Sequence, residues 1–330
     1  MRAAVHDRYG PPEVVSIRDV PVPTIGPDEL LVEVHATTVN QTDAHYRAAS
    51  PLPMRALTGL IRPRPKIWGC EFAGRVAAVG DAVSDFALGD RVFGYLEGRF
   101  GAHAEFLAIK ADRLVTRIPE GCRYADAAPM TEATHYAKSH LDSANVTTGT
   151  HVLVYGASGG IGTAAVQLAK AAGAKVTAVC ATDGMAMVTS LRPDRVIDYT
   201  VNDFTADDER YDVILDAWGM LSFRRCARIM KPRCVFTSTG PGPHLQNLFL
   251  PFATRFSRRR VVFRPPRFDR ATLDQFAGMM TSGELRAPID RTYPLEQIVD
   301  AYRFVESHRK LGNVVVEVVA DDGAGPASNV

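Results

Sequence analysis

Residues 151–162, His-Val-Leu-Val-Tyr-Gly-Ala-Ser-Gly-Gly-Ile-Gly, constrain the fold more than any other stretch. An apolar run of strand length leads directly into a glycine turn, and Ala157, Gly159 and Gly162 occupy the three small-residue positions of a dinucleotide-binding fingerprint. A helix is predicted over 163–172, because good helix formers run up to Gly173, a typical C-cap. A strand, turn and helix in this order place free backbone N–H groups and a positive helix end at the turn, which suits a pyrophosphate.

The overall composition predicts an ordinary globular protein of two domains. The chain has 330 residues, of which 46% are hydrophobic, and a net charge of +1, which provides no global field for nucleic acid or membrane. Its five cysteines are scattered and form no Cys-x-x-Cys pair, so reduced thiols are expected rather than disulfides or a structural zinc loop. The N-terminus lacks a signal-peptide pattern and no run of eighteen apolar residues occurs, so we expect a cytoplasmic protein.

The pattern of the chain changes at about residue 125. Before it, short alternating segments such as 31–36 and 74–80 are broken by Gly and Pro, which is typical of an antiparallel, partly open barrel. After it, buried-looking strands alternate with helical stretches, which predicts a doubly wound parallel (Rossmann) sheet. The six strands are expected at 152–155, 176–180, 195–198, 211–216, 234–237 and 261–263, with helices between all but the last two.

The barrel is predicted to be discontinuous. The segment after residue 288 contains a turn, a helix and one more alternating strand, which we return to the first domain. The predicted domains are therefore 1–125 with 289–320 for the barrel and 126–288 for the dinucleotide-binding domain. The small, polar residues 321–330 are expected to be a disordered tail.

Four motifs in sequence order resemble the medium-chain dehydrogenase/reductase superfamily, within it the zinc-free quinone-oxidoreductase branch. These are Gly-Cys-Glu-Phe-Ala-Gly-Arg-Val-Ala-Ala-Val-Gly at 69–80, Gly-Asp-Arg-Val-Phe-Gly at 89–94, the glycine turn, and Tyr-Asp-Val-Ile-Leu-Asp at 211–216. The resemblance spans about residues 1–319. It implies a GroES-like substrate barrel, a Rossmann domain, and hydride transfer from a reduced nicotinamide to a quinone or an α,β-unsaturated carbonyl compound.

The resemblance also bears on zinc. Where zinc-dependent relatives place a cysteine, a histidine and a second cysteine, this chain has Asn40, Cys70 and Met130. Only Cys70 is a plausible ligand, whereas a catalytic zinc needs three protein ligands. We therefore expect no metal, with Cys70 beside Glu71 as the one remaining candidate.

Without a metal, hydrogen-bond donors or a general acid must meet the charge that develops on the acceptor oxygen. The string Asn-Gln-Thr-Asp-Ala-His-Tyr-Arg at 40–47 matches the family pattern and supplies the candidate catalytic residues His45, Asn40 and Tyr46. His45 stands where zinc-dependent relatives often carry a proton-relay histidine, and its ordinary pKa suits a proton shuttle. A surface histidine is the competing interpretation, and Tyr46 is the substitute donor.

The nicotinamide cofactor is left open between NADPH and NADH. Asp183, about twenty residues past the glycine turn, favours a ribose 2′-hydroxyl and hence NADH, whereas the family resemblance favours NADPH. Arg192 and Arg195 remain candidate contacts for a 2′-phosphate, together with Thr182 and Tyr199. The predicted cofactor-binding residues are Thr134, Ala157, Ser158, Gly159, Gly160, Ile161, Gly162, Thr182, Asp183, Tyr199, Thr239, Gly240 and Asn313.

An insertion at 244–260 is apolar at first and then strongly basic. We interpret it as a lid or dimer-contact helix with a solvated basic end, in preference to a membrane-surface or nucleic-acid segment. The partner is expected to be a small-molecule quinone or enone, and the resemblance suggests a homodimer.

The leading hypothesis is a zinc-independent NAD(P)H oxidoreductase that reduces quinones or activated double bonds. The alternatives are a dinucleotide-binding redox sensor with little turnover and a zinc alcohol dehydrogenase. Replacing His45 by alanine is expected to lower turnover more than cofactor affinity.

Overall fold

The computed structural model describes residues 1–50 and 52–319, without the side chains at positions 53 and 57. The predicted tail, 321–330, lies outside the described residues. The chain forms two compact units. Unit 1 comprises Met1–Glu132, Phe268–Gly283 and the chain from Ile289, and unit 2 comprises Ala133–Arg267 and Glu284–Pro288.

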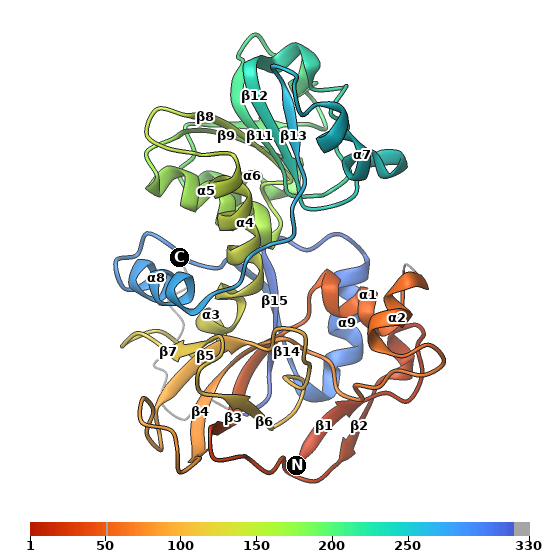
Figure 1. The fold of residues 1–330 in the computed structure, drawn as a ribbon, viewed down its shortest axis with the longest axis vertical. Helices are drawn as coiled ribbons and strands as arrows, with labels where there is room; N and C mark the ends of the chain where they lie inside the picture. The colour runs from red at the N-terminus through yellow and green to blue at the C-terminus, as the bar shows by residue number, and fades with distance from the viewer. Residues whose placement is uncertain (51, 320–330) are drawn as a thin grey trace. The chain divides into compact units, whose positions relative to one another are not determined.

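Unit 2 contains a six-stranded sheet with the order β10-β9-β8-β11-β12-β13, in which every pair is parallel (Figure 1). Its core is made by apolar residues from successive strands, including Leu153, Val179, Ile214 and Phe236. The predicted Rossmann sheet is confirmed, since buried parallel strands produce the continuous apolar runs seen in the sequence. The strands are β8 (His151–Tyr155), β9 (Lys175–Cys180), β10 (Arg195–Asp198), β11 (Tyr211–Asp216), β12 (Met230–Ser238) and β13 (Arg260–Val262).

The helices of this sheet differ from expectation at two connections. Between β10 and β11, and between β11 and β12, the chain makes only the short 3-10 turns η5 (Phe204–Ala206) and η6 (Ala227–Ile229). Asp203 accepts hydrogen bonds from the backbone and hydroxyl of Thr205, and such local bonds compete with a helix. The helices present are α4 (Glu132–Ser143, its first residue belonging to unit 1), α5 (Gly160–Ala171), α6 (Met185–Ser190) and α7 (Gln246–Ala253), with η4 (Thr182–Gly184) and η7 (Pro243–Leu245).

Unit 1 is built on a seven-stranded sheet with the order β14-β15-β3-β4-β5-β7, to which β6 adds by pairing with β3. All pairs are antiparallel except β14 with β15, which confirms the mostly antiparallel GroES-like domain. A separate two-stranded sheet is formed by β1 (Arg2–Val5) and β2 (Ser16–Asp19). The strands of the main sheet are β3 (Glu29–Thr38), β4 (Glu71–Val79), β5 (Arg91–Tyr95), β6 (Phe106–Lys110), β7 (Val115–Arg117), β14 (Ile289–Pro294) and β15 (Asn313–Glu317).

Two helices of unit 1 illustrate how local sequence sets its elements. The α1 helix (Gln41–Ala48) begins with a capping box between Asn40 and Asp43 and ends at Ala49, which is left-handed with φ 50°. The α9 helix (Ile298–Glu306) buries Ile298 and residues three, four and seven positions later, the spacing of an amphipathic helix. The remaining helices and 3-10 turns are α2 (Arg55–Thr58), α3 (Tyr124–Ala127), α8 (Arg270–Thr281), η1 (Pro12–Val14), η2 (Leu52–Met54), η3 (Ala128–Met130) and η8 (Leu295–Gln297).

The boundaries of the units differ from the predicted domains in two stretches. Residues 126–132 group with unit 1, because α3 and η3 pack on β3 and β4. Helix α8 also groups with unit 1, where it packs on β7. Both stretches were assigned by sequence position to the dinucleotide-binding domain, and these long-range contacts leave no local signal in the sequence.

Candidate functional site

The carboxyl edge of the parallel sheet in unit 2 gathers most of the predicted cofactor-binding residues. Strands that run in the same direction bring the turns after β8, β9, β10 and β12 to one edge, where ligands of open α/β sheets bind. Two predicted residues are not part of this edge: Thr134 is buried in α4, and Asn313 begins β15 in unit 1. Those at the edge are Ala157, Ser158, Gly159, Gly160, Ile161, Gly162, Thr182, Asp183, Tyr199, Thr239 and Gly240.

Three glycines of the turn after β8 have different surroundings. Gly156 has φ +77°, so the left-handed residue lies one position before the predicted Ala157, which explains why alanine is accepted there. A Cβ on Gly162 would lie 2.1 Å from the carbonyl oxygen of Gly156, so α5 packs directly against the turn. A Cβ on Gly159 would meet nothing nearer than 3.7 Å. The turn therefore leaves open space at the N-terminus of α5, whose cap makes no side-chain hydrogen bond.

Asp216, at the end of β11, shapes the neighbouring turns. Its buried carboxylate accepts hydrogen bonds from the backbone N–H groups of Gly219 and Leu221, both at 2.8 Å, and from the hydroxyl of Ser238 at 2.9 Å. Burial raises the pKa of Asp216, while these donors oppose the shift. In the sequence, Asp216 stands out only as the last residue of the motif at 211–216, and this role was not predicted. A carboxylate directly after a buried strand was the available signal.

The turns after β9 and β10 form a hydroxyl and carboxylate network. The Thr182 hydroxyl donates to Asp198 at 2.6 Å, and Asp198 also accepts from the backbone and hydroxyl of Thr200. These hydrogen bonds lower the pKa of Asp198. Asp183 is exposed in η4, beyond the end of β9.

Arg192 and Arg195 are corrected as candidate phosphate contacts. Arg195 is the first residue of β10 and pairs with Asp207 at 2.6 Å, and Arg192 lies in the turn before that strand. Both are therefore at the amino edge of the sheet, a strand length away from the glycine turn.

The predicted catalytic residues lie on or beside α1 in unit 1. Asn40 caps the helix, and its Nδ2 donates to Glu132 at 2.6 Å. Tyr46 is half-buried and packs against Trp68 and Phe100, with ring centroids 5.8 and 5.0 Å away, and burial raises the pKa of its phenol. His45 is exposed, and partial burial lowers the pKa of its imidazole. The structure thus brings Asn40 into a buried network and leaves His45 outside it.

Three carboxyl groups outside the predicted catalytic set are buried beside Asn40. Asp43, Glu71 and Glu132 expose 0%, 3% and 6% of their surface. They come from α1, β4 and α4, far apart in the sequence. The Glu71 carboxylate accepts from the Thr131 hydroxyl and the Glu132 backbone N–H, both at 2.7 Å, at the start of α4. A charged residue next to the apolar run of β4 was the only signal that could have found this cluster.

The donors around Cys70 do not fit a zinc ion. Burial raises the pKa of the Cys70 thiol well above its usual value, and the thiol donates to the carbonyl oxygen of Arg99 at 3.8 Å. The Asn40 side chain is occupied at both ends, since its Oδ1 accepts from the Asp43 backbone at 2.9 Å. Over residues 1–50 and 52–319, no three His, Cys, Asp or Glu side chains are arranged to hold a metal.

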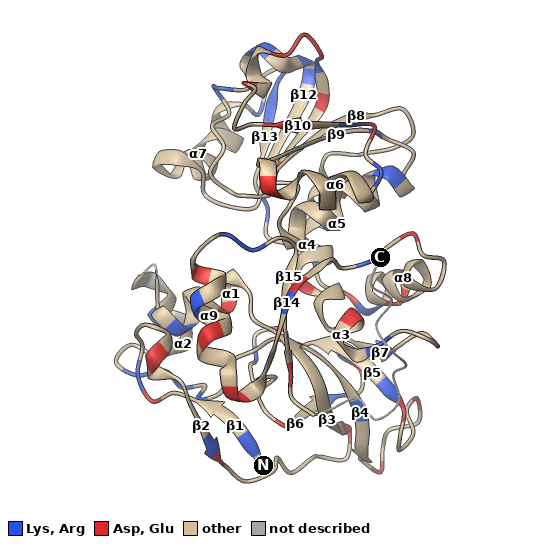
Figure 2. Ribbon diagram, turned by 180° about the vertical axis from the view of Figure 1, so that it is seen from behind, with Lys and Arg blue, Asp and Glu red and all other residues tan. Residues whose placement is uncertain are grey.

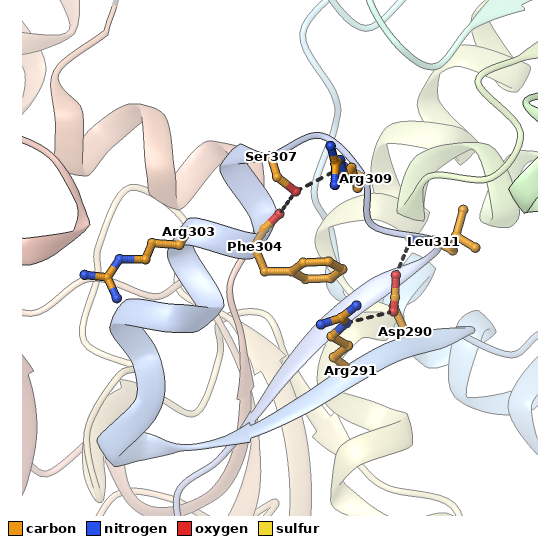
Figure 3. Close-up of a pocket in the computed structure, with 7 residues that line it drawn as sticks. All are labelled: Asp290, Arg291, Arg303, Phe304, Ser307, Arg309 and Leu311. Atoms are coloured by element: carbon orange, nitrogen blue, oxygen red, sulfur yellow. Dashed lines mark hydrogen bonds and ion pairs between the residues drawn. The ribbon is translucent and has the colours of Figure 1, made fainter.

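A surface pocket of about 510 Å³ in unit 1 is a second feature (Figure 3). It contains none of the predicted site residues, and the Arg291 guanidinium lies 4.0 Å above the Phe304 ring. Two of its arginines have partners on the protein: Arg303 pairs with Glu13 and Asp300, and Arg291 pairs with Asp290. Asp290, Arg291, Arg303, Phe304, Ser307, Arg309 and Leu311 line it.

The predicted insertion at 244–260 contains helix α7, which carries no charged residue (Figure 2). Its large side chains are exposed: Phe249 by 67%, Phe252 by 80%, and the following Phe256 by 94%. Among the described helices, none is long and apolar enough to cross a bilayer.

Two family models match the chain. The alcohol dehydrogenase GroES-like domain matches residues 26–120, and the zinc-binding dehydrogenase domain matches residues 191–316. The chain is 30% identical to the NADPH-dependent alkenal/one oxidoreductase of Arabidopsis thaliana, covering 96% of this chain and 79% of that protein. It is 28% identical to the 2-methylene-furan-3-one reductase of Solanum lycopersicum, covering 97% and 79%.

The solved structure of the quinone oxidoreductase from Coxiella burnetii superposes with a TM-score of 0.86 at 25% identity, over 97% of this chain and 99% of that one. These similarities agree with the glycine turn and the mixed architecture described above. The chain is an NAD(P)H-dependent oxidoreductase of the quinone and enone type. It belongs to the quinone-oxidoreductase-like branch of the medium-chain dehydrogenase/reductase superfamily.

Proposed function

We propose that this protein reduces the activated double bond of α,β-unsaturated carbonyl compounds with a reduced nicotinamide and without a metal. The observation that carries the proposal is the engagement of Asn40. This residue stands where zinc-dependent relatives place a ligand, and both ends of its amide are held by hydrogen bonds within the protein. Charge on the acceptor oxygen must then be met by hydrogen-bond donors.

The cofactor is assigned to the carboxyl edge of unit 2. The backbone N–H groups at the start of α5 would hold the pyrophosphate, and the missing side chain of Gly159 would let it approach. Thr182, Asp183 and Tyr199 would surround the adenosine ribose. The bound nicotinamide would supply the hydride.

The residues of unit 1 would bind and polarise the acceptor. The raised pKa of Tyr46 keeps its phenol protonated, so its hydroxyl can donate a hydrogen bond at neutral pH. The rings of Tyr46 and Phe100, edge to face at 66°, offer an apolar wall for a flat conjugated compound. The names of the two plant relatives, an alkenal/one oxidoreductase and a furanone reductase, support an enone over a simple alcohol.

NADPH is proposed as a usable cofactor because the Arabidopsis relative is named for it. However, the turns after β9 and β10 present Asp183 and Asp198 and no Lys or Arg. A 2′-phosphate would therefore gain little charge stabilisation there, and we propose that NADH is accepted as well.

The test is turnover of a panel of alkenals, alkenones, quinones and alcohols with NADH and NADPH in parallel, in buffer with and without a metal chelator. We expect stoichiometric loss of nicotinamide absorbance with the alkenones and no effect of chelation. Chelation that abolishes activity would overturn metal independence. Tight cofactor binding without turnover of any compound would favour the redox-sensor alternative.

A further inference from the structure

The buried carboxyl cluster of unit 1 contains one group that is suited to store a proton. Glu71 accepts hydrogen bonds from the hydroxyls of Thr38 at 2.6 Å and Thr131 at 2.7 Å and from a backbone N–H at the start of α4. This set of donors suits a carboxylate at a positive helix end. Glu132, next to it, has one donor on each carboxyl oxygen among the described residues.

The two donors to Glu132 differ in what they can do. Asn40 Nδ2 donates at 2.6 Å and cannot accept, and its orientation is set because its Oδ1 accepts from the Asp43 backbone. The Thr42 hydroxyl also donates at 2.6 Å, but a hydroxyl can accept as well. When Glu132 is protonated, the bond to Thr42 can reverse, and the Thr42 hydrogen is then free to point elsewhere. Thr42 is partly exposed, as Asn40 is, whereas Glu132 itself is buried.

The surrounding charges favour the protonated form of Glu132. Burial and repulsion by Glu71 raise its pKa to about 7. Asp43 is fully buried, its Oδ1 has no hydrogen-bond partner within the described part of the chain, and its pKa is also raised by burial and by Glu132. The cation that faces the cluster is Lys310, whose own pKa is lowered by burial. Tyr46 and Cys70, the other titratable groups nearby, are neutral acids with raised pKa values.

We propose that Glu132 holds the proton that the reduced acceptor takes up, and that it passes this proton outward through the hydroxyl of Thr42. The inference rests on the proposed function, which supplies the reductant. It makes Glu132 a positioning residue, because it acts through Thr42 rather than on the acceptor itself.

A hydride from the reduced nicotinamide, carrying two electrons, forms the new C–H bond at the β-carbon of the enone, and the π electrons of the C=C bond shift so that negative charge develops on the carbonyl oxygen. That oxygen takes the Thr42 proton as the Thr42 oxygen takes the proton of Glu132. The products are the enol, which tautomerises to the saturated ketone, the oxidised nicotinamide and a Glu132 carboxylate. The one proton that the overall reaction consumes comes from bulk solvent and reprotonates Glu132 before the next turnover.

The first test is the pH profile of turnover with an alkenone, compared between wild type and E132Q. In the wild type, kcat is expected to fall as the pH rises through about 7, because the ionised Glu132 has no proton to give. In E132Q, kcat is expected to drop at least tenfold and this limb of the profile to disappear, with an unchanged Kd for the cofactor. E132D is expected to restore the limb, and E97Q, at an exposed glutamate of unit 1, to behave as wild type.

Two substitutions of Thr42 test the inference even if E132Q fails to fold: T42S keeps the hydroxyl and T42V removes it. T42S should retain the pH limb and T42V should lose it, since valine has the shape of threonine without the hydroxyl. A T42V or E132Q protein that is folded and keeps the wild-type profile would overturn the inference.

An infrared titration gives a readout that does not need turnover. A protonated carboxyl band that titrates near neutral pH in wild type and is absent in E132Q is expected. If this band is absent from wild type, the inference fails whether or not the protein reduces enones. If the band is present but no acceptor is turned over, the proposed function fails instead and the inferred delivery step fails with it.

Discussion

The candidate sites of the two units use different kinds of polar groups. Unit 2 forms its site from main-chain N–H groups and from the absence of side chains, as at Gly159 and Gly162. Unit 1 forms its site from side chains that hydrogen-bond one another, as Asn40, Thr42 and Glu132 do. The first site should therefore be sensitive to any added atom, and the second to the loss of a single functional group.

The largest effect is expected from G162A, which is best compared with G159A in the same turn of unit 2. In G162A the new Cβ would lie 2.1 Å from a backbone oxygen, so the free energy of unfolding should fall by about 3 kcal/mol or more. In G159A the Cβ has room and φ is −83°, so stability should change by less than about 1 kcal/mol. Denaturant unfolding measures both values.

Cofactor titration sharpens this contrast. G159A is expected to weaken NAD(P)H binding at least tenfold, because a methyl group would stand between the pyrophosphate and the N-terminus of α5. If G159A has the stability and the NAD(P)H affinity of the wild type, the diphosphate does not lie at this turn.

The next effect concerns the pH dependence of stability in unit 1. The pKa of Glu132 is raised from 4.5 to about 7 on folding. Ionisation of Glu132 therefore destabilises the folded state, by an amount that is absent below about pH 4.5 and grows until about pH 7. Unfolding free energy should therefore lose up to about 3 kcal/mol over this window from Glu132 alone. Denaturant unfolding of wild type and E132Q across this range should show a flatter dependence in E132Q. Parallel curves would mean that Glu132 ionises in the folded protein as it does in water.

A smaller effect is expected at the ribose end of unit 2. Because Asp183 is exposed, removing its charge in D183N should strengthen NADPH binding by only about two- to fivefold and leave NADH nearly unchanged. Fluorescence titration of both cofactors measures the ratio. A gain for NADH instead would place Asp183 away from the ribose.

The smallest effect is expected at His45. Its ring is exposed on α1, so H45A should change kcat by less than about threefold. The T42V variant provides the comparison on the same helix. A tenfold loss in H45A with unchanged cofactor affinity would instead make the imidazole the proton donor.

The strands of unit 2 were predictable because their signal is local. Each buried parallel strand is a short apolar run that ends in a turn, and all six predicted strands are present at nearly the predicted positions. The missing helices after β10 and β11 were not predictable, because Asp203 and Asp216 form hydrogen bonds with nearby backbone that override helix propensity.

The site of unit 1 was only partly predictable. Asn40 was found because it belongs to a local string, but its partner Glu132 is 92 positions away in the chain. The burial of Glu71 and Glu132 arises from the contact between β4 and the start of α4. The charged residue beside the apolar run of β4 is visible in the sequence, but it does not identify its distant partner. His45 was predicted from its position in the family string and its ordinary pKa, whereas its exposure is a property of the folded chain.

The burial of the cysteine thiols affects how the protein would react with electrophilic acceptors. Conjugated carbonyl compounds are attacked by thiolates, and a protonated thiol reacts far more slowly. Four of the five cysteines are buried, and burial raises the pKa of Cys180 to about 11 and those of Cys226 and Cys234 to about 12. On the proposed function, the buried thiols would be shielded from alkylation by the acceptor, and the protein should keep working at acceptor concentrations that inactivate proteins with exposed, acidic thiols.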